Sequence, residues 1–157
     1  MELAAREFTL AAGQTVPDHP VEMTPEAVTF ICKMMIDEML ELMATTYHSK
    51  ESKEKLVMMV VEAKECVCKA ETKTEKIAEQ ADALVDQLYY LLNCAAKHGI
   101  NVKPVFDAVH GANMNKVDPQ SGKFIIKDGK IQKPPGWTAP DITSIIQLQL
   151  IEGSWIS

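Results

Sequence analysis

The sequence predicts an all-α protein, a bundle of about four helices followed by a short C-terminal hairpin and an extended arm. Apolar residues recur at helical spacing through most of the first 117 residues, and a strand-like pattern is confined to the part after them. A chain of 157 residues with 46% hydrophobic content is long enough for one compact domain and short for two. We therefore expect a single domain over 1–157, with its core at about 24–117 and the hairpin and arm at 118–157.

The first long helix is predicted to begin at Pro25. Thr24 supplies a hydroxyl cap, and proline suits the first helical position because no helical hydrogen bond needs its missing N–H. The helix should continue to about Thr46. The segment before it, 1–23, contains several helix-breaking residues and reads as an irregular arm.

Three further helices are expected, at about 53–69, 74–98 and 104–116. After them, the pair Asp128-Gly129 lies between two short β-prone runs, which predicts a hairpin. The proline-rich segment 133–142 should be extended. The apolar tail that follows has no clean period, so its structure stays open.

The charge balance excludes some partners. The net charge is −6 and the isoelectric point about 5.2, whereas nucleic acids and membrane surfaces require a basic face. No run is long and apolar enough for a transmembrane helix, and no secretory segment begins the chain. Four cysteines without zinc-like spacing read as reduced thiols in the core or near the surface. We expect a cytoplasmic protein that binds neither nucleic acid nor membrane.

Glu38 and Glu41 stand three residues apart in the first long helix. Glu38 falls inside the apolar stripe formed by residues such as Ile31 and Leu42, and Glu41 borders it. A carboxylate that faces a core is desolvated at a cost of several kcal/mol unless a proton, a basic group or a metal compensates. No Lys or Arg lies within a turn of Glu38 on that face, so the pattern favours a cation.

A second group of acids lies in the helix expected at 74–98. Its members follow at three- and four-residue spacing, with no basic residue between them on that face: Glu75, Glu79, Asp82 and Asp86. Like charges at this spacing repel by roughly 0.2–0.5 kcal/mol per pair. Carboxylate oxygens without His or Cys suit Mg²⁺, with Mn²⁺ as a possible substitute, better than zinc. The alternative is a solvated acidic face.

These motifs resemble those of the all-α nucleoside triphosphate pyrophosphohydrolase superfamily, which includes MazG-like proteins, dimeric dUTPases and phosphoribosyl-ATP pyrophosphohydrolases. DEMLEL at 37–42 matches the ExxE element and EQAD at 79–82 the ExxD element. The likeness extends to DQLYYLL, HGANMNKVDPQSGK and KPPGWTAPDI, and covers roughly 8–142.

The resemblance implies a Mg²⁺-dependent enzyme that cleaves a nucleoside triphosphate between its α- and β-phosphates. The residues that it implies as metal ligands or water-activating groups are Glu38, Glu41, Glu79 and Asp82. Glu38 or Glu41 would take the proton from the attacking water. Asp86 competes with Asp82 as the aspartate of the second element, because it directly precedes the LYYLL run.

Three residues are candidate nucleotide contacts. The resemblance implies that Asn113 and Lys116 bind the substrate, through a directional hydrogen bond and a positive charge respectively. Tyr90 flanks the acidic face and could stack on a base. Trp137, in the arm, is interpreted as a strap at a subunit contact, with a lid over the nucleotide as the alternative.

The expected function is removal of canonical or damaged nucleotides from the nucleotide pool. Two alternatives remain: hydrolysis of phosphoribosyl-ATP, and a helical metal-binding or interaction protein without turnover. The resemblance implies a homodimer or homotetramer, and the apolar tail is consistent with one. We expect residues 133–157 to cross to a neighbouring subunit.

Overall fold

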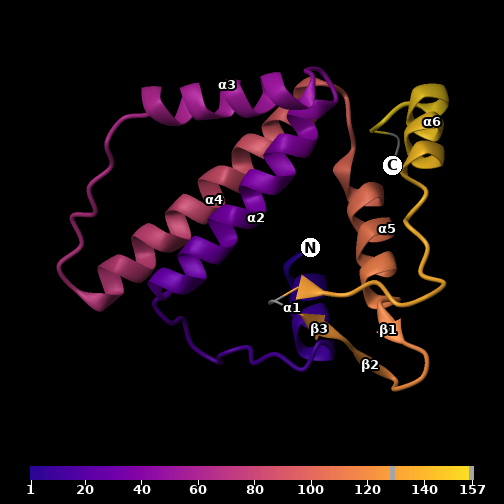
Figure 1. Cartoon of the computed structure of the whole chain (residues 1–157), viewed down its shortest axis with the longest axis horizontal. Coiled ribbons are helices and arrows are strands. Elements are labelled where there is room, and N and C mark those ends of the chain that lie inside the picture. Colours follow the sequence, from indigo (N-terminus) through magenta and orange to yellow (C-terminus); the bar gives the residue numbers. More distant parts are fainter. Residues whose placement is uncertain (128–129, 156–157) are drawn as a thin grey trace. The chain divides into compact units, whose positions relative to one another are not determined.

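Helices account for most of the chain in the computed structural model, which describes residues 1–127 and 130–155 (Figure 1). The described residues form six helices and four two-residue strands, as the all-α prediction requires. The chain divides into two compact units. One comprises Met1–His19 and Val85–Ser157, and the other comprises Pro20–Leu84.

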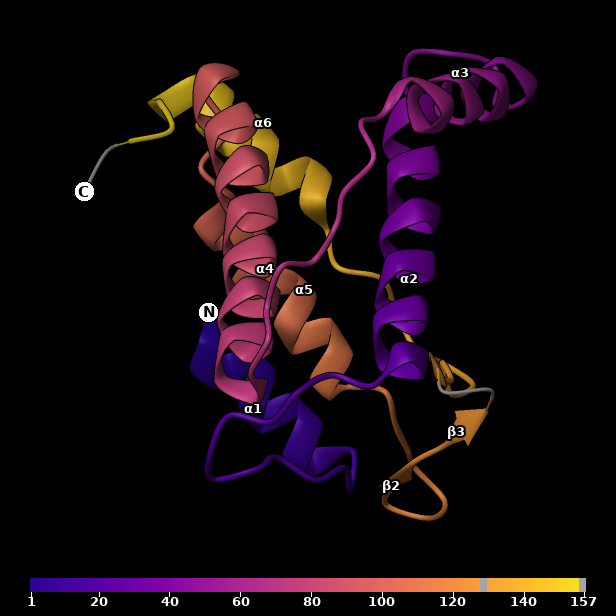
Figure 2. The ribbon, with the colours of Figure 1, turned by 90° about the vertical axis from the view of Figure 1, so that its left-hand side faces the viewer.

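The 20–84 unit begins with helix α2 (Pro25–Ala44). The Thr24 hydroxyl accepts a hydrogen bond from the Ala27 N–H at 3.2 Å, which confirms the predicted helix start. The helix ends two residues earlier than expected. Helix α3 (Ser49–Glu62) follows and crosses the end of α2 in both views (Figures 1 and 2).

Helix α3 begins and ends earlier than the predicted range of 53–69. Its first turns carry charge pairs at four-residue spacing, Lys50 with Glu54 and Glu51 with Lys55, which favour an early start. The β-branched valines near its end lower helix propensity. Ala63 then adopts an extended conformation, with ψ of 141°, and ends the helix.

Helix α4 (Lys73–Lys97) begins with a capping box, and its part up to Leu84 belongs to the 20–84 unit. The Glu75 N–H donates to the Thr72 hydroxyl at 3.2 Å, while the Glu75 carboxylate accepts the Thr72 N–H at 2.9 Å. Two N–H groups that lack helical partners are thereby satisfied. The observed helix differs from the expected 74–98 by one residue at each end.

The other unit contains helices α1 (Glu2–Ala11), α5 (Val102–Met114) and α6 (Ile142–Glu152), and α5 contacts the other two (Figure 2). The prediction of an irregular arm over 1–23 was wrong for α1. This helix is anchored by tertiary contacts: the Phe8 ring meets the Phe124 ring edge-on at 5.4 Å. The sequence left the structure of the apolar tail open, and residues Ile142–Glu152 of it form helix α6.

Two short hairpins follow α5. Strand β1 (Val117–Asp118) pairs antiparallel with β2 (Lys123–Phe124), and no sequence signal had indicated this pair. Strand β3 (Ile126–Lys127) pairs with β4 (Lys130–Ile131), as predicted. The predicted turn, Asp128-Gly129, lies outside the described residues.

The C-terminal arm and tail contact their own chain in this structure. The Gln149 side-chain amide forms two hydrogen bonds with the Asn101 backbone, both of 2.9 Å, and Asn101 Nδ2 donates to the Ser154 carbonyl at 3.0 Å. The Trp137 indole N–H donates to the Ala112 carbonyl of α5 at 2.7 Å. These hydrogen bonds attach the arm and the residues of and just after α6 to α5 and its N-cap residue.

Little apolar surface is buried in either unit. Among the described residues only Ala12 and Ser52 are buried. A run of five apolar residues on α3 is more than half exposed: Val57, Met58, Met59, Val60 and Val61. All four cysteines are free and exposed. No helix within the described part of the chain is long and apolar enough to cross a membrane.

Candidate functional site

The first acid pair lies in the middle of α2. Glu38 and Glu41 are both exposed, and neither forms a salt bridge or a side-chain hydrogen bond among the described residues. In the single chain Glu38 does not face a covered core, contrary to the expectation. The reason is that the apolar stripe around it is open, with Ile31 37% and Leu42 63% exposed.

The second pair lies on α4. Glu79 and Asp82 are exposed and are likewise free of ion pairs and side-chain hydrogen bonds in the part of the chain described here. Glu75, the first acid of the predicted face, has a different role, because its carboxylate binds the Thr72 and Glu71 N–H groups at the helix start, each at 2.9 Å. These hydrogen bonds hold the pKa of Glu75 below its ordinary value.

A bidentate contact joins the start of α2 to α4 within the 20–84 unit. The Gln80 side-chain oxygen accepts the Met23 N–H at 2.9 Å, and its amide nitrogen donates to the Met23 carbonyl at 3.2 Å. One turn earlier on α4, Lys76 lies 3.6 Å from the Glu22 carboxylate. Because Gln80 sits between Glu79 and Asp82 in the sequence, this contact ties the second acid pair to the helix that carries the first.

Asp86 and Tyr90 lie further along α4, in the part assigned to the unit that contains α1, α5 and α6. Asp86 follows Asp82 by four residues, about one helical turn, so it extends the same face. Tyr90 is 73% exposed and is available to stack on a ligand. The competition between Asp82 and Asp86 is therefore not decided by accessibility.

The acids do not yet form a metal centre in a single chain. No group of three or more His, Cys, Asp or Glu side chains that could hold an ion occurs within residues 1–127 and 130–155. The donor chemistry nevertheless fits Mg²⁺ or Mn²⁺, because the acids of the two pairs offer only carboxylate oxygens. The acids therefore fit these ions by the type of ligand atom that they offer. To bind an ion, the carboxylates would have to lie closer together than they do in the single chain.

The nucleotide-contact candidates of the third motif lie at the end of α5. Asn113 is in its last turn, and Lys116 follows the C-cap residue Asn115. The Lys116 N–H donates to the Asn113 carbonyl at 3.0 Å. Burial lowers the pKa of Lys116 below 10.5, and the positive charge of Lys133 lowers it further. Sequence reasoning did not name Lys133, although it is the first residue of the KPPGW segment that carries part of the family resemblance.

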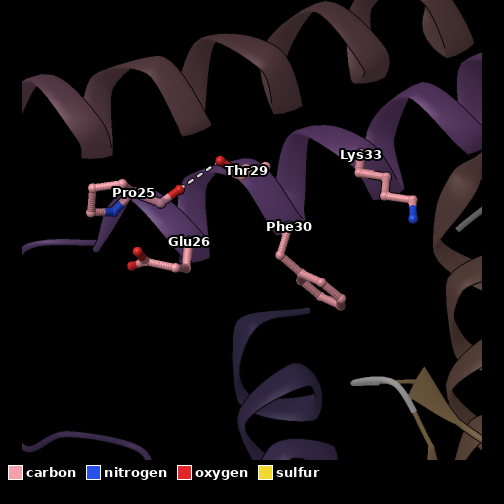
Figure 3. A pocket seen from close by; sticks show the side chains of 5 residues that line it. All are labelled: Pro25, Glu26, Thr29, Phe30 and Lys33. Atoms are coloured by element: carbon pink, nitrogen blue, oxygen red, sulfur yellow. Dashed lines mark hydrogen bonds between the residues drawn. The ribbon is translucent and has the colours of Figure 1, made fainter.

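Hollows also occur on the surface of the described part of the chain. One, of about 410 Å³, is an open depression along the first turns of α2, where Glu26 and Phe30 project from the same side of the helix (Figure 3). The Thr29 hydroxyl is engaged with the Pro25 carbonyl at 2.7 Å. Another, of about 310 Å³, lies between the residues after α5 and the KPPGW arm.

Comparison with known proteins places these motifs in a family. The model of the phosphoribosyl-ATP pyrophosphohydrolase family matches residues 5–113, well over half of the chain. The chain therefore belongs to this family, within the all-α, MazG-like pyrophosphohydrolase superfamily, and is a pyrophosphohydrolase, an enzyme acting on acid anhydrides.

A solved structure shares the fold. It is a crystal structure of a protein proposed to be an NTP pyrophosphohydrolase from Exiguobacterium sp. 255-15, with a TM-score of 0.82 and 23% sequence identity over 96% of each chain. At this identity the likeness establishes the fold alone. No curated protein sequence matches the chain significantly.

Proposed function

We propose that this protein is a Mg²⁺-dependent nucleoside triphosphate pyrophosphohydrolase that acts on the cytoplasmic nucleotide pool. It converts a (deoxy)nucleoside triphosphate and water into the monophosphate and diphosphate. The observation that carries the proposal is the exposure of Glu38 and Glu41 on α2 and of Glu79 and Asp82 on α4, none of which forms an ion pair within the described residues, in a chain of a pyrophosphohydrolase family.

The carboxylates have a direct role in this chemistry. Within the described residues Glu38, Glu79 and Asp82 form no ion pair, so they can bind a divalent ion without first breaking one. Mg²⁺ at these acids would neutralise the triphosphate and lower the pKa of a bound water. Glu38, Glu79 and Asp82 would hold the ion, while Glu41 or Glu38 takes the proton of the attacking water.

Exposed apolar surface near the acids supports this proposal. The apolar stripe of α2, which contains Glu38, is open in the single chain, and so is most of α3. Exposed apolar surfaces of this extent mark association sites. We propose that a second copy of this chain covers them in a homodimer or homotetramer. Glu38 would then become desolvated, as its place in the stripe predicts, and would need the cation for compensation.

Phosphoribosyl-ATP is the second candidate substrate, and the family description favours it. It carries the same triphosphate group, so the acids would act in the same way. The two candidate substrates differ only in the chemical groups that the protein would recognise beyond the phosphates.

A substrate panel tests the proposed function. The protein is assayed with each common ribo- and deoxyribonucleoside triphosphate and with phosphoribosyl-ATP, with and without Mg²⁺, and pyrophosphate release is measured. We expect release from at least one nucleoside triphosphate that requires Mg²⁺ and is lost in Glu79→Gln. The matched control Glu62→Gln removes an exposed carboxylate of α3 in the same unit and should retain activity. Release from phosphoribosyl-ATP alone would select the second candidate, and no release from any substrate would contradict both.

A further inference from the structure

Two lysines meet at one tryptophan ring in the unit that contains α5. Lys133 Nζ lies 4.6 Å from the centre of the Trp137 ring system, and Lys116 Nζ lies 5.7 Å from it. Ammonium groups within about 6 Å of an aromatic face are attracted by its negative electrostatic potential. Two positive charges therefore lie close to one aromatic ring. We call Lys116, Lys133 and Trp137 the lysine–tryptophan cluster.

The ring is held in place from two sides. Its indole N–H donates to the Ala112 carbonyl at 2.7 Å, and the Trp137 backbone N–H donates to the Pro134 carbonyl at 3.1 Å. Gly136 makes the tight turn between Pro134 and Trp137. Its φ of 81° is a conformation that L residues rarely adopt. The cluster is thus attached to a fixed backbone.

No acid balances the charges of the two ammonium groups in the part of the chain that the structure describes. Neither forms a salt bridge within residues 1–127 and 130–155. Asp118, the acid nearest to Lys116 in sequence, accepts the Ser121 N–H at 2.9 Å. Burial and the neighbouring Lys133 charge lower the pKa of Lys116 below its ordinary value, and a bound anion would offset both effects.

The space beside the cluster is suited to a small ligand. A hollow of about 310 Å³ is bordered by Trp137 itself, by Asn115 and Val117 after α5, and by Pro134 and Thr138 of the arm. This volume is at the lower end of the range of about 300–1,000 Å³ that is typical of small-molecule sites. The prolines in the lining restrict the backbone and so reduce the conformational entropy that ligand binding would remove.

We propose that the lysine–tryptophan cluster binds a diphosphate group, with Lys133 and Lys116 supplying the positive charge beside the Trp137 ring. The identity of the ligand rests on the proposed function: the group is either the terminal diphosphate of the nucleotide or the released pyrophosphate. The site itself rests on the contacts and the hollow, which do not depend on turnover.

Trp137 fluorescence tests the site directly. Trp155 is replaced by Phe, so that Trp137 is the only tryptophan, and pyrophosphate without divalent metal is titrated into the full-length protein. We expect a saturable change in emission. Lys133→Gln and Lys116→Gln should each weaken binding by about tenfold, the effect of losing one charged hydrogen bond. Added salt should also weaken binding.

Controls separate the charge from general effects on the fold. Lys133→Arg keeps the charge and should restore binding, whereas Lys123→Gln removes an exposed charge in the same unit and should leave binding unchanged. A nucleoside without phosphates should cause no change. Absence of a saturable response to pyrophosphate and to a non-hydrolysable triphosphate, or equal affinity in Lys133→Gln, would overturn the proposal.

Comparing the two ligands identifies the source of the diphosphate group. Equal or tighter binding of free pyrophosphate indicates a product site, and tighter binding of the triphosphate analogue indicates a substrate site. Either result supports the cluster as a diphosphate site. If the emission change is lost in Lys133→Gln but the protein releases no pyrophosphate from any substrate, the site stands and the proposed function fails.

Discussion

Gln80 of α4 holds the backbone of Met23 through two hydrogen bonds, one accepted at 2.9 Å and one donated at 3.2 Å. Met23 directly precedes the cap of α2, so a single side chain connects the two helices that carry the acid pairs. This connection supplies a first test of how the 20–84 unit is held together.

Gln80→Ala should destabilise the protein by about 1–3 kcal/mol, since two hydrogen bonds to partly buried groups are lost. The free energy of unfolding, measured by urea titration, checks this. Gln147→Ala, an exposed glutamine of α6, is the control and should change stability by less than about 0.5 kcal/mol. Equal effects of the two substitutions would contradict the role of Gln80.

The capping box of α4 predicts a pH dependence. The Thr72 N–H, the Glu71 N–H and the Thr72 hydroxyl bind the Glu75 carboxylate and lower its pKa from the ordinary 4.5. A carboxyl group whose pKa is depressed in the folded state stabilises the protein at any pH above its pKa in the unfolded state. This stabilisation is lost as the pH falls through the pKa of the folded state.

Glu75→Gln should therefore flatten the fall in melting temperature below pH 4.5 and leave a less stable protein at neutral pH. Melting curves of both proteins between neutral and acidic pH provide the measurement. Parallel curves over the whole range would show that the capping carboxylate makes no contribution through its ionisation.

Most helices could be predicted because their signals are local. Thr24 and Pro25 mark the start of α2, and the periodicity of α4 located it to within one residue at each end. Helix α1 was missed because contacts such as the one between Phe8 and Phe124 stabilise it, and those join residues far apart in the sequence. Local propensity contains no information about such contacts.

The candidate site divides in the same way. The acid pairs followed from spacing on one helix, which a sequence shows directly. The cluster around Trp137 did not, because Lys116 and Lys133 are far apart in the sequence and meet at the Trp137 ring only in the folded chain. The exposure of Glu38 was also missed, since periodicity predicts which face is apolar but not what covers it.

The metal proposal predicts a stability effect. Mg²⁺ or Mn²⁺ should stabilise the folded protein by about 2.7 kcal/mol when the free ion is at about 100 times its Kd. Glu38→Ala and Asp82→Ala should each abolish this stabilisation without loss of helical content, whereas Glu62→Ala should retain it. Thermal melts with and without metal test this, and an unchanged metal effect in both site variants would contradict the assignment.

The assembly proposal predicts a mass. Light scattering at micromolar concentration should give a dimer or tetramer, and Val60→Glu, which introduces a charge on the exposed apolar face of α3, should shift the protein toward monomer. Glu62→Lys changes the charge of the same helix outside the apolar run and should leave the mass unchanged. A monomeric wild-type protein would refute the proposal.

The bond that is cleaved tests the central claim most directly. Hydrolysis of a substrate triphosphate in ¹⁸O-labelled water, followed by mass spectrometry of both products, shows which phosphorus the water attacks. We predict equal amounts of nucleoside monophosphate and pyrophosphate, with the label on the monophosphate, because the water that Glu38 or Glu41 deprotonates attacks the α-phosphorus. Label in the pyrophosphate, or direct release of orthophosphate with a nucleoside diphosphate, would contradict the proposed mechanism.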